Sequence, residues 1–314
     1  MTIVKMRDNA PLHVRTIGRG QPVLMLPGLG MNSNQWLPFV LPYSRQFRFI
    51  MPDFRGQGRS KHIAFNQSDV FQNHMEDTQD VIRHFALDDF LLVGISLGAT
   101  TSLHLQREAG WDGVRGYLHI DQSPCVVNKP DWNHGLAGGK QPALFERMQA
   151  VLDILNRHSD NHWFDQLPRN DKQKISGLLS EVLGILGSDR PTIKVVSNLW
   201  RLPAGVIRRL PLMQREVLAR YMAAYSGGGH DYRSSLGRDD VPVTLMIGMN
   251  SVLYAEAGQR LIAEKNTRSE VICFEHSGHV PLLSEPRKFL REFGRFLRQD
   301  YAWQQTETST ATAT

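Results

Sequence analysis

The residue best placed to do chemistry is Ser96, which lies in the pentapeptide GISLG at positions 94–98. The apolar run FLLV at 90–93 precedes this pentapeptide, and the residues after it can form a helix. A sharp turn from a strand into a helix lifts a serine hydroxyl clear of the sheet, where a base can activate it as a nucleophile. Gly94 and Gly98 leave room for the backbone to fold over itself there. The segment predicts a nucleophile, with a chance Gly/Ser turn as the alternative.

Strand-like and helix-like segments alternate on both sides of Ser96. Strands are predicted at 2–7, 11–17, 23–26, 47–51, 90–95, 116–120, 241–247 and 270–274, and helices at 33–43, 68–85, 97–108, 255–264 and 285–298. Such alternation is typical of a mostly parallel sheet with helices on both faces. The sequence therefore predicts an α/β fold.

The alternation stops after Asp121 and resumes at Val241. The residues between contain amphipathic helical faces, such as the one formed by Ile175, Leu179 and Val182. We therefore expect a helical cap at 122–240, inserted between two parts of an α/β core at 1–121 and 241–300. The Thr-rich end, 301–314, has little to bury and is predicted to be disordered.

Composition narrows the class of protein. The 314 residues are 41% hydrophobic and 21% charged, which is typical of a globular protein with a large core. Neither a signal peptide nor an apolar span long enough for a bilayer is evident, so we expect no membrane span and a cytoplasmic location. The net charge of +5 is mild, and the arginines lie at helix-surface spacing, so we expect no nucleic-acid partner.

Metal and disulfide chemistry are not indicated. The two cysteines, Cys125 and Cys273, are too few and too far apart for a disulfide framework, and the 12 histidines show no ligand spacing. We expect no cofactor and no metal ion. No motif indicates an oligomeric state.

Four segments, in order, give the chain a resemblance to the α/β-hydrolase fold superfamily. They are LPGLG at 26–30, PDFRGQGRS at 52–60, GISLG at 94–98 and SGHVPLLSEP at 277–286. The resemblance covers residues 2–297. It implies a doubly wound eight-stranded sheet flanked by helices, with the helical cap inserted after strand 6, and a Ser-His-acid triad in a lid-bearing enzyme.

The resemblance also assigns the base and the oxyanion donors. His279, preceded by Gly278, matches the superfamily's catalytic histidine, and the competing His276 is expected to be part of the loop structure. The oxyanion donors implied are the backbone N–H groups of Leu29 and Leu97, whose side chains should also face the substrate. Many relatives carry a histidine just before this Gly-x-Gly, where this chain has Pro27.

The acid departs from the common pattern. Relatives usually place an aspartate after the seventh strand, where this chain reads GMNSVLY at 248–254 without a carboxylate. Asp121, at the end of the sixth strand, is the expected substitute, because a triad is defined by geometry and not by order in the chain. The alternatives are a histidine oriented by Asn250 or Ser251, or a purely capping role for Asp121. Asp53 is expected to be structural, with a hydrogen bond within the site as the alternative.

A serine nucleophile suits acyl transfer to water, and an apolar cap suits a small ester, lactone or thioester with hydrocarbon character. Trp36 is predicted to line the substrate pocket. The cap's apolar residues could instead form only its own core. Two other functions stay open: an acyltransferase or perhydrolase that uses the same acyl-enzyme, and a weakly active ligand-binding homologue.

Overall fold

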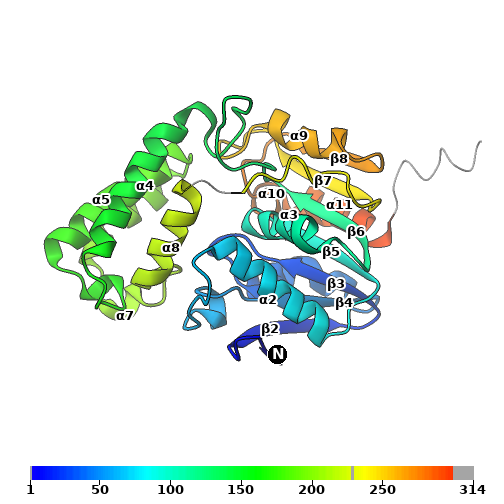
Figure 1. Cartoon of the computed structure of the whole chain (residues 1–314), viewed down its shortest axis with the longest axis horizontal. Helices are drawn as coiled ribbons and strands as arrows, with labels where there is room; N and C mark the ends of the chain where they lie inside the picture. The colour runs from blue at the N-terminus through cyan, green and yellow to red at the C-terminus, as the bar shows by residue number, and fades with distance from the viewer. Residues whose placement is uncertain (1, 228–229, 300–314) are drawn as a thin grey trace, which may run out of the picture.

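A computed structural model describes residues 2–227 and 230–299, so the tail predicted to be disordered lies outside the described residues. Eight strands form one sheet in the order β1-β2-β4-β3-β5-β6-β7-β8 (Figure 1). The first two strands in this order pair antiparallel, as do β2 and β4, and every later pair is parallel. The predicted fold class, a mostly parallel eight-stranded sheet with a helical insert after β6, is confirmed. The strands are β1 Thr2–Lys5, β2 Pro11–Gly18, β3 Gln21–Leu26, β4 Phe47–Pro52, β5 Phe90–Ile95, β6 Val114–Ile120, β7 Val243–Gly248 and β8 Ser269–Phe274.

Helices cover both faces of the sheet. The core helices are α1 Leu37–Val40, α2 Val70–His84, α3 Leu97–Ala109, α9 Glu256–Glu264, α10 Pro281–Ser284 and α11 Pro286–Arg298, with short 3-10 turns at Ser33–Trp36, Leu41–Tyr43 and Gly58–Ser60. Side chains alternate along each strand, so that Leu24 and Leu92 pack with α2 and α3, whereas Val23 and Val93 pack with α11 on the other face. The core therefore has two layers, one on each side of the sheet.

One predicted helix is broken into pieces. The segment 33–43 is two 3-10 turns flanking the single-turn α1, because Pro38 and Pro42 lack the backbone N–H that a continuous helix needs. By contrast, α2 is continuous and begins after Asp69, whose carboxylate accepts from the backbone N–H of Phe71 at 2.8 Å.

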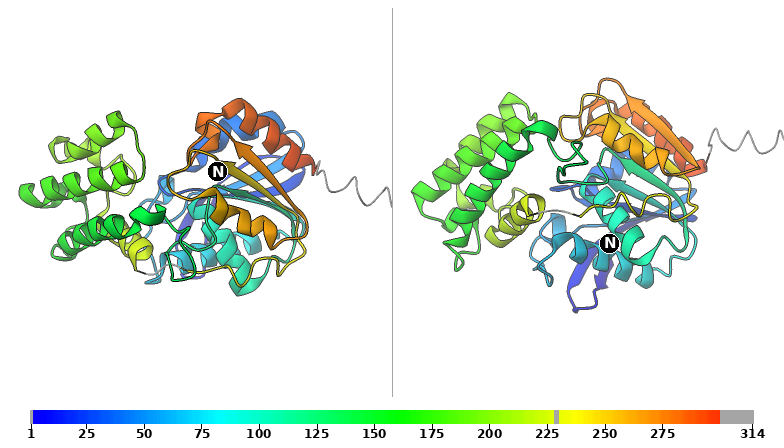
Figure 2. Two further views of the ribbon diagram at one scale, coloured as in Figure 1. Left: turned by 90° about the horizontal axis from the view of Figure 1, so that it is seen from above. Right: turned by 45° about the horizontal axis from the view of Figure 1, so that its top comes forward.

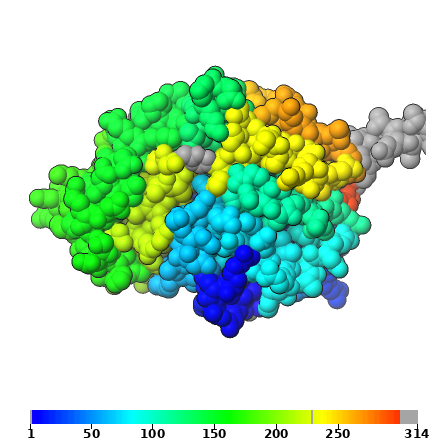
Figure 3. Space-filling view, viewed as in Figure 1, coloured from blue at the N-terminus to red at the C-terminus, as the bar shows by residue number. Residues whose placement is uncertain are grey.

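The insert after β6 forms a separate helical lobe beside the sheet (Figure 2). Its helices are α4 Gln141–Asn156, α5 Arg169–Ile185, α6 Arg190–Ser197, α7 Ala204–Ile207 and α8 Arg215–Ser226, with 3-10 turns at Gly138–Lys140, Phe164–Gln166 and Leu199–Arg201. Helix α8 lies nearest the core, and the lobe and the core present one continuous surface (Figure 3). We call this lobe the cap. Among the described residues, no helix combines the length and the hydropathy needed to cross a membrane.

Buried histidines make the fold sensitive to acid. Burial lowers the pKa of His74 to about 3, and burial likewise lowers the pKa of His104 and of His119 to about 4. The unfolded chain takes up these protons near pH 6.5, whereas the folded chain does not. The free energy of unfolding should therefore fall as the pH drops from 6.5 to 4, by about 1.4 kcal/mol per pH unit for each histidine.

Urea unfolding between pH 4.5 and 7 measures this slope. The variant His119→Gln should show a slope shallower by about 1.4 kcal/mol per pH unit, because the unfolded variant takes up one proton fewer. His84→Gln, at an exposed position, should keep the slope of the parent protein. Equal slopes in all three proteins would contradict the assignment.

Candidate active site

The nucleophile turn forms as predicted. Ser96 follows β5 with φ 51° and ψ −115°, and α3 begins at the next residue. Few residues other than glycine adopt a positive φ, and such strained positions gather at functional sites. Two close approaches require glycine here: a Cβ on Gly98 would lie 2.2 Å from the carbonyl oxygen of Leu26, and one on Gly94 would lie 2.6 Å from that of Gly98. The turn thus presents the serine at the carboxyl edge of the sheet.

Three side chains predicted from the sequence come together at this edge. The hydroxyl of Ser96 lies 2.9 Å from Nε2 of His279, and Nδ1 of His279 lies 2.6 Å from Oδ2 of Asp121. They come from the ends of β5, β6 and the loop after β8, three elements that the sheet order places within four neighbouring strands. This is the geometry of a nucleophile, a base and an orienting acid.

The carboxylate of Asp121 is fully buried and saturated with donors. Its Oδ1 accepts from the backbone N–H of Gly248 at 2.9 Å and from the amide of Gln259 at 3.1 Å. Its Oδ2 accepts from the hydroxyl of Ser251 at 2.7 Å as well as from His279. Hydrogen bonds of this kind fix the orientation of the carboxylate. Ser251, the alternative orienting residue from the sequence, thus contacts Asp121.

The two expected oxyanion donors lie on segments that follow neighbouring strands, β3 and β5. Leu29 is in the turn after β3, and Leu97 is the first residue of α3, where backbone N–H groups have no partner within the helix. A Cβ on Gly28 would lie 3.6 Å from Cβ of Ser96, so the turn passes close to Ser96. The side chain of Leu29 lines the cavity described below, but that of Leu97 is fully buried in the core, contrary to expectation.

A cavity of about 450 Å³ lies beside Ser96 and His279, between the core and the cap. The wall is mostly apolar, and the core contributes Ile95, Leu253 and Leu282 among others. The cap residues in the wall include Met148, Val182, Leu186, Tyr221, Met222 and Tyr225. A cavity of this size and character is typical of a site for a small organic molecule.

Trp36 was predicted to line the pocket, and that prediction is wrong. Its side chain is fully buried among Phe39, Val40 and α11, on the face of the sheet away from the cap. The turn that carries Trp36 places the indole on the same face of the sheet as the apolar side chains of Phe39 and Val40.

The remaining candidates have structural partners. His276 is exposed, and its backbone N–H donates to Glu285. Asp53 is buried, where its carboxylate accepts from the backbone N–H of Ser33 at 2.6 Å and of Arg59 at 2.9 Å. Within residues 2–227 and 230–299, no group of three His, Cys, Asp or Glu side chains could hold a metal ion.

Sequence reasoning missed Gln259, Gln57 and Tyr221. Gln259 supports the acid, and the other two connect the oxyanion turn to the cap. A signal for Gln259 was available, because a polar residue on an otherwise apolar helix face needs a buried partner. Tyr221 and Gln57 gave none, since they are 164 residues apart.

Comparison with known proteins identifies the family. A sequence model of the alpha/beta hydrolase family matches residues 23–292, so the chain belongs to this family. It is 25% identical over 285 residues to a pimeloyl-[acyl-carrier protein] methyl ester esterase of Nitrosomonas europaea, covering 90% of this chain and 98% of that protein. It is 28% identical to the AB hydrolase superfamily protein YisY of Bacillus subtilis, covering 91% and 94%.

The fold is also shared with solved structures. An esterase from Exiguobacterium antarcticum superposes with a TM-score of 0.68 at 21% sequence identity, covering 95% of this chain and 99% of that one. At this level of sequence identity the likeness to the solved structure concerns the fold alone.

Proposed function

We propose that this protein is a serine esterase that cleaves a carboxylic ester of a largely apolar small molecule through an acyl-enzyme on Ser96. The observation that carries the proposal is the unbroken hydrogen-bonded series from Ser96 through His279 to Asp121, which opens on an apolar cavity. Lactones and thioesters present the same reacting carbonyl and fall within the proposal.

The reaction follows from this geometry. Nε2 of His279 takes the hydroxyl proton of Ser96 as Oγ bonds to the carbonyl carbon, and the N–H groups of Leu29 and Leu97 stabilise the negative oxygen. The tetrahedral intermediate collapses, the bond to the alkoxy group breaks, and the alcohol leaves with the proton from His279. A water molecule then repeats the sequence on the acyl-enzyme and releases the carboxylic acid.

The apolar cavity wall supports the proposed substrate class. An apolar wall stabilises a hydrocarbon acyl group by about 0.8 kcal/mol for each methylene that it buries, which is about fourfold in kcat/KM. The relative from Nitrosomonas europaea, by its name, hydrolyses the methyl ester of a pimeloyl group, which is also an acyl ester. We therefore propose that the acyl part of the substrate occupies the cavity and that methyl esters are suitable leaving groups.

A series of p-nitrophenyl esters from acetyl to decanoyl tests the proposal, with methyl esters, lactones and acyl-thioesters alongside. We expect kcat/KM to rise by up to about fourfold per methylene and to level off when the cavity is full. Highest activity on acetate would contradict an acyl-binding cavity. Adding alcohol or peroxide acceptors and measuring the product partition distinguishes hydrolysis from acyl transfer.

A further inference from the structure

A buried amide connects the oxyanion turn to the cap. Oε1 of Gln57 accepts from the backbone N–H of Gly30 at 2.5 Å, and Nε2 of the same side chain donates to the hydroxyl of Tyr221 at 2.9 Å. The side chain of Gln57 is fully buried. One side chain therefore holds a residue of the turn after β3 and a residue of α8 at the same time.

The cap end of this connection is also fixed. The hydroxyl of Tyr221 lies 2.8 Å from Nε2 of His74, on α2, and both side chains are fully buried. Burial and, to a smaller extent, the nearby positive charge of Arg55 lower the pKa of His74 to about 3. This histidine therefore stays neutral at ordinary pH. The phenol ring of Tyr221 lines the cavity, so the connection reaches the substrate-binding wall.

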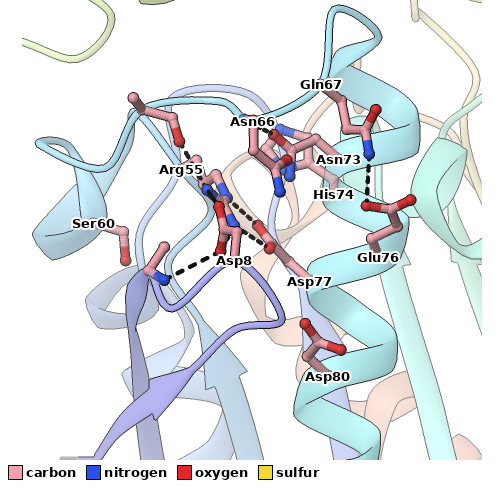
Figure 4. Close-up of polar contacts among 12 residues, drawn as sticks. Asp8, Arg55, Ser60, Asn66, Gln67, Asn73, His74, Glu76, Asp77 and Asp80 are labelled. Atoms are coloured by element: carbon pink, nitrogen blue, oxygen red, sulfur yellow. Dashed lines mark hydrogen bonds and ion pairs between the residues drawn. The ribbon is translucent and has the colours of Figure 1, made fainter.

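The loop that carries Gln57 is anchored at its base (Figure 4). The guanidinium of Arg55 binds the carboxylate of Asp77 on α2 through two contacts of 2.7 and 2.8 Å, and that of Asp8 at 2.7 Å. Above this base, Gly56 has φ +75°, and a Cβ there would lie 2.6 Å from the side chain of Val217 on α8. Because the loop is clamped to α2 and in close contact with α8, Gln57 has little freedom to move.

The turn itself has few other constraints of this strength. The backbone N–H of Met31 donates to the carbonyl of Gly28 at 3.1 Å, which closes the turn around Leu29. Gly30 has a positive φ of 79°, a conformation that glycine adopts at low cost and can also leave at low cost. The hydrogen bond from Gly30 to Gln57 fixes the peptide group between Leu29 and Gly30. The N–H of Leu29, the expected oxyanion donor, belongs to the preceding peptide group.

We propose that Gln57 and Tyr221 are positioning residues for the reaction, which hold the Leu29 N–H at the oxyanion through Gly30 and couple its position to the cap. This inference rests on the esterase function proposed above. A donor that is displaced stabilises the transition state less than one held in place, while substrate binding in the cavity changes little. Loss of the connection should therefore lower kcat more than it changes KM.

Three variants test the inference. Gln57→Met keeps the length of the side chain without its polar atoms, and Tyr221→Phe removes only the hydroxyl. Tyr232→Phe is the matched control, because Tyr232 is also fully buried with its hydroxyl 3.1 Å from a buried histidine, His104, but does not line the cavity. The hydrolysis of one p-nitrophenyl ester gives kcat and KM, and circular dichroism confirms that each variant folds.

We expect kcat to fall about tenfold in each test variant with KM within about twofold, less than the loss for deleting an oxyanion donor outright. The double variant should lose no more than either single variant, because both break one connection. A trifluoromethyl ketone, whose carbonyl adds Oγ of Ser96 to give a bound oxyanion, should lose affinity by the same factor as kcat/KM. Tyr232→Phe should match the parent in all three measurements.

Unchanged kcat in both test variants, additive losses in the double variant, or a change confined to KM would overturn the inference. If Gln57→Met does not fold, Tyr221→Phe decides alone, because it removes a single atom. A parent protein that neither hydrolyses esters nor forms the ketone adduct would instead refute the proposed esterase function. A parent that does both, with variants that equal it, would refute only the positioning role.

Discussion

Replacing Ser96 by alanine is expected to lower kcat/KM for ester hydrolysis by about 10⁴-fold or more and to abolish covalent labelling by a fluorophosphonate. In the proposed mechanism the oxygen of this hydroxyl becomes acylated, and it is the hydroxyl that lies 2.9 Å from Nε2 of His279. The backbone strain at φ 51° remains in the variant, and one side-chain hydrogen bond is lost, so the free energy of unfolding should change by only about 1 kcal/mol.

Ser102→Ala is the matched control for this experiment. Ser102 is a fully buried serine on α3, and its hydroxyl donates to the carbonyl of Gly98 at 2.9 Å without contacting the triad. This variant should label at one fluorophosphonate per chain, as the parent should. Mass spectrometry of the intact protein measures the stoichiometry. Labelling that persists in Ser96→Ala would assign the nucleophile to another residue.

Replacing Asp121 by asparagine should lower kcat by about 10⁴-fold, because the substitution should hold His279 in the wrong tautomer. Oδ1 of Asp121 accepts from the backbone N–H of Gly248, a donor that cannot reverse. The amide oxygen of the variant must therefore stay at this position, which places its NH₂ group against Nδ1 of His279. The imidazole then has to carry its proton on Nε2, where it can no longer accept the proton of Ser96.

The rate of fluorophosphonate labelling and the kcat of ester hydrolysis should fall together in Asp121→Asn, while circular dichroism and the urea midpoint show a folded protein. Asp112→Asn, at an exposed position, makes the same chemical change elsewhere and should leave both rates unchanged. If Asp121→Asn hydrolysed esters at a rate near that of the parent, another group would have to orient His279.

The strands and the Ser96 turn could be predicted because their signals are local. A parallel strand buried on both faces is a continuous apolar run, and the nucleophile turn needs glycines at fixed positions. A site role for Asp121 could be predicted for two reasons. The segment 248–254, where relatives usually place the acid, contains no carboxylate, and β6 pairs with β5 and ends beside it.

Contacts between distant segments could not be predicted in the same way. Trp36 looked like an entrance residue from its place after the oxyanion turn, but the face on which it packs depends on how prolines divide the segment 33–43. The pairing of Gln57 with Tyr221 depends on how the cap sits on the core. An amphipathic helix such as α8 shows which of its faces is buried, but not which residue it meets.

With Asp121, directly after β6, as the proposed acid, the segment after β7 does not have to supply a carboxylate. The hydroxyl of Ser251 donates to the carboxylate of Asp121, and Tyr254 forms part of the cavity wall. The carbonyl of Leu253 accepts from the backbone N–H of Ala137, in the insert after β6, at 2.7 Å. In an enzyme that keeps the triad acid in this segment, substitutions there can displace the acid. Here Ser96, His279 and Asp121 all lie outside 252–254, so these positions can be varied in the directed evolution of substrate preference without replacing a residue of the hydrogen-bonded series.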